Sequence, residues 1–372
     1  MNKDFLDYST YKYEKITGRY LPYASLNKFY NEYNFVNKKN VGFSVNGTPI
    51  HLLTLGRGTT KVLMWSQMHG NESTTTKAVL DLISYLNSDT ETVKHILEKI
   101  TIYIIPMLNP DGADAYTRYN ANEIDLNRDS QNLTQPESKV LRATFEAIKP
   151  DFCFNLHDQR TIFGVEDTPY PATVSFLAPS EDEQRTVTTT RKIAMELITY
   201  MQEALAEYIP NQIARFDDGF NINCIGDTFT YLGVPTILFE AGHFPEDYER
   251  EETRKYIFLS LITALDKIST QKITGEGFKN YFEIKNNKKS FFDILIKNFN
   301  FAEEEEENEN EIGVLFEENL QNNNIFLFPY VEKIGNLQSF YGHKTIDAQF
   351  NNSKITKEEL LTADIEEILK KI

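Results

Sequence analysis

Residues 61–86, KVLMWSQMHGNESTTTKAVLDLISYL, contain the pattern that decides the fold. The segment opens with the apolar run VLMW, which is typical of a buried strand. It closes with apolar residues at the spacing of one helix face, preceded by Ser and Thr residues suited to an N-cap. Between the strand and the helix, HGNE places His69 and Glu72 three residues apart in a short loop. Taken alone, His69 also fits a loop histidine with ordinary hydrogen-bond partners.

The alternation of strand and helix continues to about residue 270. A strand hairpin over residues 42–56, with a turn signal at Asn46-Gly47, precedes the opening stretch. Strand-like runs follow at 100–108, 151–156 and 235–240, and helical patterns at 136–148, 191–205 and 250–268. Strands separated by helices predict an α/β domain with a mixed, largely parallel central sheet and helices on both faces.

The remainder of the chain differs in composition. We expect a catalytic domain over residues 1–272, with residues 1–40 as an N-terminal extension packed on it, and a small β-rich module over 273–372. The acidic run EEEEENENE at 303–311 predicts a solvated loop in that module. A terminal amphipathic helix is expected at 357–371. No chemical motif is visible in this part.

Composition narrows the function classes. The 372 residues carry a formal net charge of -17, which opposes binding to nucleic acid or to anionic lipid because both are polyanions. The first residues lack the apolar segment of a signal peptide, and no apolar run reaches the length of a membrane span. We therefore expect a cytoplasmic protein that contacts neither nucleic acid nor membrane. Two cysteines alone do not suggest a disulfide framework.

Polar side chains follow four of the predicted strands at the point where each strand ends. His69, Asn109, His157 and Glu240 come directly after the apolar runs at 62–68, 100–108, 151–156 and 235–239. In an open α/β sheet, functional groups gather at the carboxyl ends of the strands. The sequence therefore predicts that these side chains converge at one edge of the sheet.

The converging residue types are those of a catalytic zinc site. Such a site takes three ligands from His and Asp or Glu and keeps a fourth position open for water. His69, Glu72 and His157 offer that set, and Glu240 is a candidate general base for the water. A salt-bridged glutamate at the strand end is the alternative for Glu240.

The segment TRYNANEIDLNRDS, residues 117–130, offers a second group of polar side chains. The guanidinium groups of Arg118 and Arg128 and the amide of Asn127 match a carboxylate ligand. Asp125 is a candidate acceptor that orients a ligand histidine. For each residue by itself, a solvated turn is the alternative.

Five motifs in this order, HGNE, NPDG, TRYNANEIDLNRD, NLH and FEAG, resemble the zinc carboxypeptidase family, the carboxypeptidase A-like metallopeptidases. The resemblance spans about residues 41–270 and leaves the C-terminal module uncovered. Carboxypeptidase A is itself an example of a catalytic zinc held by two His and one Glu. The resemblance implies one zinc ion, bound by His69, Glu72 and His157.

The resemblance also implies roles for the other polar residues. Glu240 is then the general base, Arg118 polarises the scissile carbonyl, and Asn127 with Arg128 holds the free C-terminal carboxylate of a peptide. Asp125 supports the histidine of HGNE.

One feature departs from the family pattern. The tyrosine that covers the substrate in the family has no counterpart at the corresponding distance before Glu240, where Phe216 and Phe220 lie instead. By the resemblance, the floor of the specificity pocket lies near Gly226, where no side chain charge would select the terminal residue.

The expected function is that of a zinc metallocarboxypeptidase that hydrolyses the C-terminal peptide or peptide-like bond. Two alternatives stay open. One is a zinc amidase or deacylase acting on a small N-acyl amino acid, as in the aspartoacylase-like group. The other is a catalytically silent relative that binds metal or peptide.

Overall fold

The computed structural model describes residues 7–33, 37–299, 301, 310–348, 356 and 360. Apart from Leu360, the expected terminal helix lies outside these residues, as does most of the expected acidic loop.

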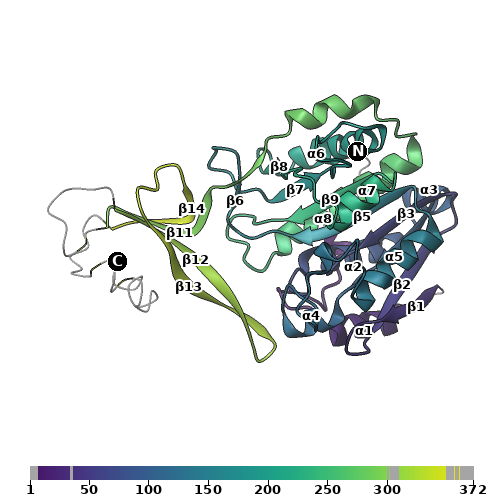
Figure 1. Ribbon diagram of the computed structural model, residues 1–372, viewed down its shortest axis with the longest axis horizontal. Coiled ribbons are helices and arrows are strands. Elements are labelled where there is room, and N and C mark those ends of the chain that lie inside the picture. The colour runs from purple at the N-terminus through teal and green to yellow at the C-terminus, as the bar shows by residue number, and fades with distance from the viewer. Residues whose placement is uncertain are drawn as a thin grey trace.

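The large domain is built on an eight-stranded mixed sheet (Figure 1). In the order in which they pair, its strands are β1 (Lys38–Phe43), β2 (Pro49–Gly56), β4 (Ile100–Ile105), β3 (Thr60–Trp65), β5 (Phe152–Asp158), β9 (Thr236–Ala241), β7 (Val174–Leu177) and β8 (Ile213–Arg215). The four central strands β4, β3, β5 and β9 run parallel to one another, whereas β1, β2 and β7 join by antiparallel pairing. The expected hairpin is β1 and β2.

Helices cover both faces of this sheet. The helices are α1 (Tyr23–Glu32), α2 (Thr74–Leu86), α3 (Glu91–Lys99), α4 (Pro110–Ala115), α5 (Pro136–Ile148), α6 (Thr189–Ala206), α7 (Ile225–Tyr231) and α8 (Glu251–Thr270), with 3-10 turns η2 (Tyr8–Thr10), η3 (Leu126–Arg128) and η4 (Glu276–Glu283). Val62 and Met64 of β3 pack on one side with α2, α3, α6 and α8, while Leu63 and Trp65 pack on the other side with α5 and α7. This alternation follows from the period of two along a strand.

A second, four-stranded sheet forms the C-terminal module. Its order is β13 (Asn324–Gly335), β12 (Glu311–Gln321), β11 (Phe291–Lys297) and β14 (Tyr341–Asp347). The short strand β10 (Asn287–Lys289) precedes this sheet in the chain. It pairs with β6 (Phe163–Val165), which follows β5 in the large domain. The expected fold class, a mixed and largely parallel α/β sheet with a small β-rich C-terminal module, is confirmed. The boundary at residue 272 stays a prediction; the four-stranded sheet starts at Phe291.

A buried ion pair joins the N-terminal residues to the large domain. Arg254 of α8 donates from Nε and Nη2 to both oxygens of Asp81 on α2, at 2.7 and 2.6 Å, and neither side chain is exposed. The same guanidinium donates to the carbonyls of Tyr13 and Ile16, and Asp81 also accepts from the Tyr13 N–H. One buried pair thus links two helices and the N-terminal segment. Of the helices that the structure describes, none combines the length and the apolar character that a bilayer span requires.

Replacing Asp81 by Ala is expected to lower the free energy of unfolding by about 3–5 kcal/mol, because the buried Arg254 would lose its two-oxygen partner and keep only the ion pair of Nη1 with Glu251. Urea denaturation measures this change. Arg57→Ala, which breaks the exposed Arg57–Glu98 pair, is the control and should cost less than about 1 kcal/mol. Equal losses in the two variants would contradict a special role for the buried pair.

Candidate active site

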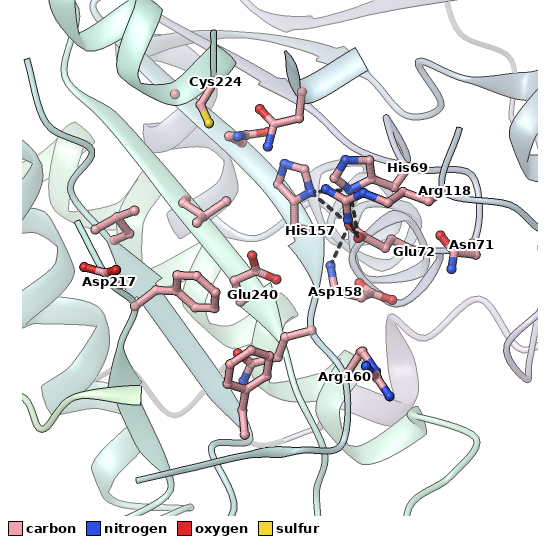
Figure 2. A pocket seen from close by; sticks show the side chains of 18 of the residues that line it. His69, Asn71, Glu72, Arg118, His157, Asp158, Arg160, Asp217, Cys224 and Glu240 are labelled. Atoms are coloured by element: carbon pink, nitrogen blue, oxygen red, sulfur yellow. Dashed lines mark hydrogen bonds and ion pairs between the residues drawn. The ribbon is translucent and has the colours of Figure 1, made fainter. Parts of the chain in front are cut away.

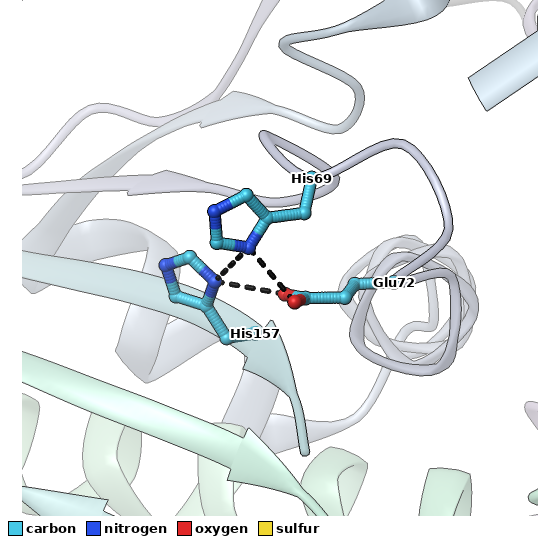
Figure 3. A group of neighbouring side chains, drawn as sticks. All are labelled: His69, Glu72 and His157. Carbon is cyan, nitrogen blue, oxygen red and sulfur yellow. Dashed lines mark hydrogen bonds and ion pairs between the residues drawn. The ribbon is translucent and has the colours of Figure 1, made fainter. Parts of the chain in front are cut away.

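The three predicted metal ligands meet at the carboxyl end of the central strands (Figure 3). The Nδ1 atom of His69 lies 2.8 Å from Oε1 of Glu72, and the Nδ1 atom of His157 lies 2.8 Å from Oε2 of the same carboxylate. The two Nδ1 atoms are 3.1 Å apart, and all three side chains are buried. Among the described residues, this is the group of His, Cys, Asp and Glu side chains whose geometry suits a metal ion.

The hydrogen-bond pattern fits a cation at the centre of this group. The Nε2 atom of His69 lies 3.0 Å from Oδ1 of Asp125; in the tautomer with the proton on Nε2, this atom donates to Asp125 and Nδ1 keeps its lone pair. That lone pair faces a carboxylate oxygen and the nitrogen of His157. Electron-rich atoms at these distances repel one another unless a proton or a metal cation lies among them. Two imidazoles and one carboxylate are the ligands of a catalytic zinc site, so the residues present fit this metal.

The end of β5 fixes Glu72 relative to His157. Asp158, the next residue along the strand, accepts hydrogen bonds from the backbone N–H groups of Thr74 and Thr75 at the start of α2. A carboxylate is stabilised there by the helix dipole. The Asp158 N–H in turn donates to Oε2 of Glu72 at 3.1 Å. The strand that carries His157 therefore also holds the start of α2, which directly follows the loop that carries Glu72.

The NPDG motif positions the HGNE loop. The buried side chain of Asn109 donates to the carbonyls of Met68 and Tyr119, and it accepts from the Gly112 N–H at the start of α4. A Cβ atom on Gly70 would lie 1.9 Å from the carbonyl carbon of Gly112, so the HGNE loop and α4 approach as closely as glycine permits. The motif thus has a structural role behind the ligands.

Asp125 links the ligand histidine to Arg118. Its Oδ2 accepts from Nε and Nη2 of Arg118 at 3.1 and 3.0 Å, while its Oδ1 faces His69. Burial opposes ionisation of Asp125, but the contacts with His69 and Arg118 prevail and hold its pKa below the usual range. The Nη1 atom of Arg118 also lies 3.6 Å from Oε1 of Glu72. The carboxylate therefore fixes both the histidine ring and the guanidinium group.

Glu240 lies beside the cluster on the neighbouring strand. The register of β5 and β9 pairs it directly with His157, and Figure 2 shows its carboxylate directed toward the same space. The carboxylate has no hydrogen-bond or ion-pair partner among the residues that the structure describes. Burial, together with the charges of Glu72 and Asp158, raises the pKa of Glu240 well above the ordinary value. A buried, unpaired carboxylate next to a candidate metal site is suited to proton transfer.

A cleft of about 870 Å³ opens in front of these residues. Asn127 and Arg128 line it, and the Asn127 Oδ1 accepts from the N–H of Ile225 at the start of α7. The cleft therefore brings together all eight residues that the sequence singled out: His69, Glu72, Arg118, Asn127, Arg128, His157 and Glu240 line it, and Asp125 lies behind His69. Of the two phenylalanines, Phe216 lines the cleft and Phe220 does not.

Several other lining residues were not found from the sequence. Asp227 of α7 lies next to the expected pocket floor, and its carboxylate accepts from the Ser180 N–H. Its position directly after Gly226 was a signal that could have identified it. The C-terminal module also contributes, through Phe316 and Tyr330. No local pattern in those strands indicates contact with the cleft.

His243 does not take part in the cleft. Its buried ring lies 4.1 Å from the ring of His343 and 4.7 Å from that of Tyr248, measured between centroids. It therefore belongs to the contact between the large domain and the module.

Comparison with known sequences gives a family match. Residues 23–134 match the family model described as zinc carboxypeptidase. The chain is 30% identical over 123 residues to probable carboxypeptidase 2 of Arthroderma benhamiae and 30% identical over 145 residues to carboxypeptidase M of Mus musculus. Each alignment covers 32% of this chain, and they span 23% and 32% of the two relatives' own lengths. His157 and Glu240 lie outside the family match.

Comparison with solved structures extends the likeness of the fold. A metallo-carboxypeptidase from Burkholderia cenocepacia superposes with a TM-score of 0.52 at 20% identity and covers 66% of this chain and 69% of its own. A putative carboxypeptidase A from Shewanella denitrificans gives a TM-score of 0.55 at 18% identity, with 67% and 70% covered.

The resemblance to this family is therefore confirmed: residues 23–134, which hold the first three of the five motifs, match the zinc carboxypeptidase model, and the large domain around them has the fold of the metallocarboxypeptidases.

Proposed function

We propose that this protein is a zinc-dependent metallocarboxypeptidase that hydrolyses the C-terminal peptide or peptide-like bond. The observation that carries the proposal is the convergence of His69, Glu72 and His157 beside the unpaired carboxylate of Glu240. One zinc ion per chain is part of the proposal. When bound, zinc polarises a carbonyl and makes a water molecule more acidic.

The roles of the protein's own groups follow from their positions. Glu240 accepts a proton from the attacking water and then delivers it to the nitrogen of the leaving amine. Arg118 is fixed by Asp125 next to the ligand cluster, where a cation stabilises negative charge developing on the carbonyl oxygen. Because the guanidinium is already held in position, little reorganisation is needed when that charge develops.

The terminal carboxylate of the substrate is assigned to Asn127 and Arg128. Both line the cleft close to the start of α7, and the guanidinium of Arg128 is exposed to it. The only hydrogen bond found for that group among the described residues is to the carbonyl of Asn127, at 2.8 Å. A cation without a carboxylate partner at this place supports recognition of a free chain end.

Glu240→Gln should retain about one zinc ion per chain, while kcat should fall by about 10²- to 10⁴-fold because the amide cannot accept the proton. Metal content by mass spectrometry and hydrolysis of a peptide library measure the two effects. His157→Ala should lose the metal as well as the activity. Glu203→Gln, an exposed change on α6, is the matched control. Full activity in Glu240→Gln would assign the base elsewhere.

Peptides with a free C-terminus should be cleaved, whereas the same peptides with an amidated C-terminus should resist. Arg128→Ala should lower kcat/KM for the free peptides by roughly 10- to 100-fold, as expected for loss of one hydrogen bond between charged groups. Arg57→Ala is the control. Equal cleavage of both peptide forms would contradict the carboxylate assignment, and cleavage of small N-acyl amino acids alone would indicate the deacylase.

Asp227 is expected to make the choice of terminal residue depend on pH. Burial raises the pKa of Asp227 to about 7, so the carboxyl group is neutral below that pH and charged above it. The ratio of kcat/KM for a Lys-terminated to a Leu-terminated peptide should rise up to about tenfold from pH 6 to pH 8. Because the ratio cancels ionisations common to both substrates, it isolates this group. Asp227→Asn should give a flat ratio, and a flat ratio in the unmodified protein would refute the assignment.

A further inference from the structure

The hairpin of β12 and β13 extends well beyond the rest of the module sheet. β11 pairs with β12 only over Ile312–Val314, whereas β12 and β13 remain paired to their turn at Gln321 and Asn324. Figure 1 shows the hairpin running beside the large domain toward α4. A two-stranded ribbon with this little sheet support is marginal by itself, so its contacts with the large domain matter.

Two contacts fix the hairpin at the cleft. Glu318 of β12 forms an ion pair of 2.6 Å with Arg19 and accepts a hydrogen bond from the hydroxyl of Tyr116. The ring of Phe316 lies 5.4 Å from that of Tyr248, between centroids, and its N–H donates to Asp293 at 2.9 Å. The hairpin is therefore held in a defined position relative to the catalytic residues.

Three aromatic side chains stand in a row on one face of β13. Phe326, Phe328 and Tyr330 occupy alternate positions, which point to the same side of a strand about 6.8 Å apart. They are 46%, 40% and 36% exposed. One exposed aromatic ring is ordinary, but a contiguous set marks an interaction surface. We call these three residues the aromatic row.

The aromatic row meets the catalytic cleft at one end, at Tyr330, whereas Phe326 and Phe328 lie outside the cleft lining. Tyr330 lines the cleft, and its hydroxyl accepts from Nη2 of Arg160 at 3.4 Å. In Figure 2, Arg160 and Cys224 lie on opposite sides of His157 and Glu240. Because Cys224 adjoins the start of α7, where the terminal carboxylate is assigned, a substrate leaving the catalytic residues in the other direction passes Arg160 and reaches Tyr330.

We propose that the aromatic row binds the segment of a peptide substrate that precedes the scissile bond. This proposal rests on the proposed carboxypeptidase function. An extended peptide presents every second side chain to one side at the same spacing as the aromatic row, so apolar side chains at alternate positions contact successive rings. Glu317 faces Phe328 across the hairpin, so acidic side chains at these positions are disfavoured. The substrate class is an extended peptide with alternating apolar residues upstream of its C-terminus.

The test measures binding separately from turnover. Isothermal titration of the zinc-loaded Glu240→Gln protein uses peptides of two to eight residues with one C-terminal sequence. Alternating Phe and Ser upstream give two series of opposite register, which are compared at even numbers of upstream residues, where their compositions are equal. We expect affinity to rise about tenfold or more with length in one series and clearly less in the other. In the triple variant Phe326→Ala, Phe328→Ala, Tyr330→Ala, the gain with length should fall below about threefold.

Phe43→Ala, an exposed aromatic on the edge strand β1, is the matched control and should keep the full gain. A gain that persists in the triple variant, or that is equal in both registers, overturns the proposal. So does a change in oligomeric state of the triple variant without a change in peptide affinity, since the row would then be a contact between copies of the chain. If the unmodified protein cleaves the short peptides but length has no effect on affinity for the variant, only this inference fails. If the variant binds no peptide and the unmodified protein cleaves none, the proposed function fails.

Discussion

The parallel register of β5 and β9 is the constraint on which the candidate active site depends. It places His157 and Glu240 side by side, so a predicted ligand and the predicted base are held by backbone hydrogen bonds rather than by flexible loops. A slip of one residue would turn Glu240 to the opposite face of the sheet, because side chains alternate along a strand. The apolar residues of β9 on both sides of the glutamate pack into the core and oppose such a slip. Burying the unpaired carboxylate of Glu240 costs free energy, but it does not shift the strand because the packing of the apolar residues fixes the register.

The HGNE loop has no such strand to hold it, and its order comes from a second set of contacts. Asn109 joins the loop to the segment that contains Arg118, and Asp158 joins the end of β5 to the start of α2. Gly70 permits close contact with α4. These contacts are made by backbone groups, by the buried side chain of Asn109 and by the half-buried side chain of Asp158, and each of the two side chains has several partners. Such networks are specific in geometry because each unsatisfied member would cost free energy. The ligand atoms consequently meet although they come from segments more than 80 residues apart.

The sequence predicted most of this arrangement because its signals were local and repeated. The helix at 136–148 has the predicted bounds, and its apolar residues recur on one face after a proline at the first turn. The two candidate histidine ligands could be named because each follows an apolar strand, and Glu72 because it lies three residues after His69 in the same loop. The short elements α4, α7, β7 and β8 were not predicted, since three to seven residues carry too little periodicity, and contacts such as that of Asn127 with the start of α7 come from distant segments. Asp227 was missed although it directly follows Gly226, because the helix α7 that carries it into the cleft lining was not predicted. The position of the module relative to the cleft could not be predicted from the sequence. It depends on contacts such as the ion pair between Arg19 and Glu318, which neither local sequence indicates.

That ion pair changes how the two parts of the chain relate to each other. An exposed pair between flexible side chains contributes little to stability. Here the Arg19 side chain is only 11% exposed and Glu318 27%, and the Tyr116 hydroxyl donates to the same carboxylate. Removing both charges from water costs free energy, and their attraction offsets this cost only in this geometry. The pair therefore acts mainly to fix the position of the hairpin relative to the large domain. The N-terminal segment, α4 and the hairpin are therefore joined at one point on the rim of the cleft. A module attached only by its linker would leave the cleft open on this side, whereas a hairpin held at Glu318 gives the cleft a wall that belongs to the C-terminal part of the chain.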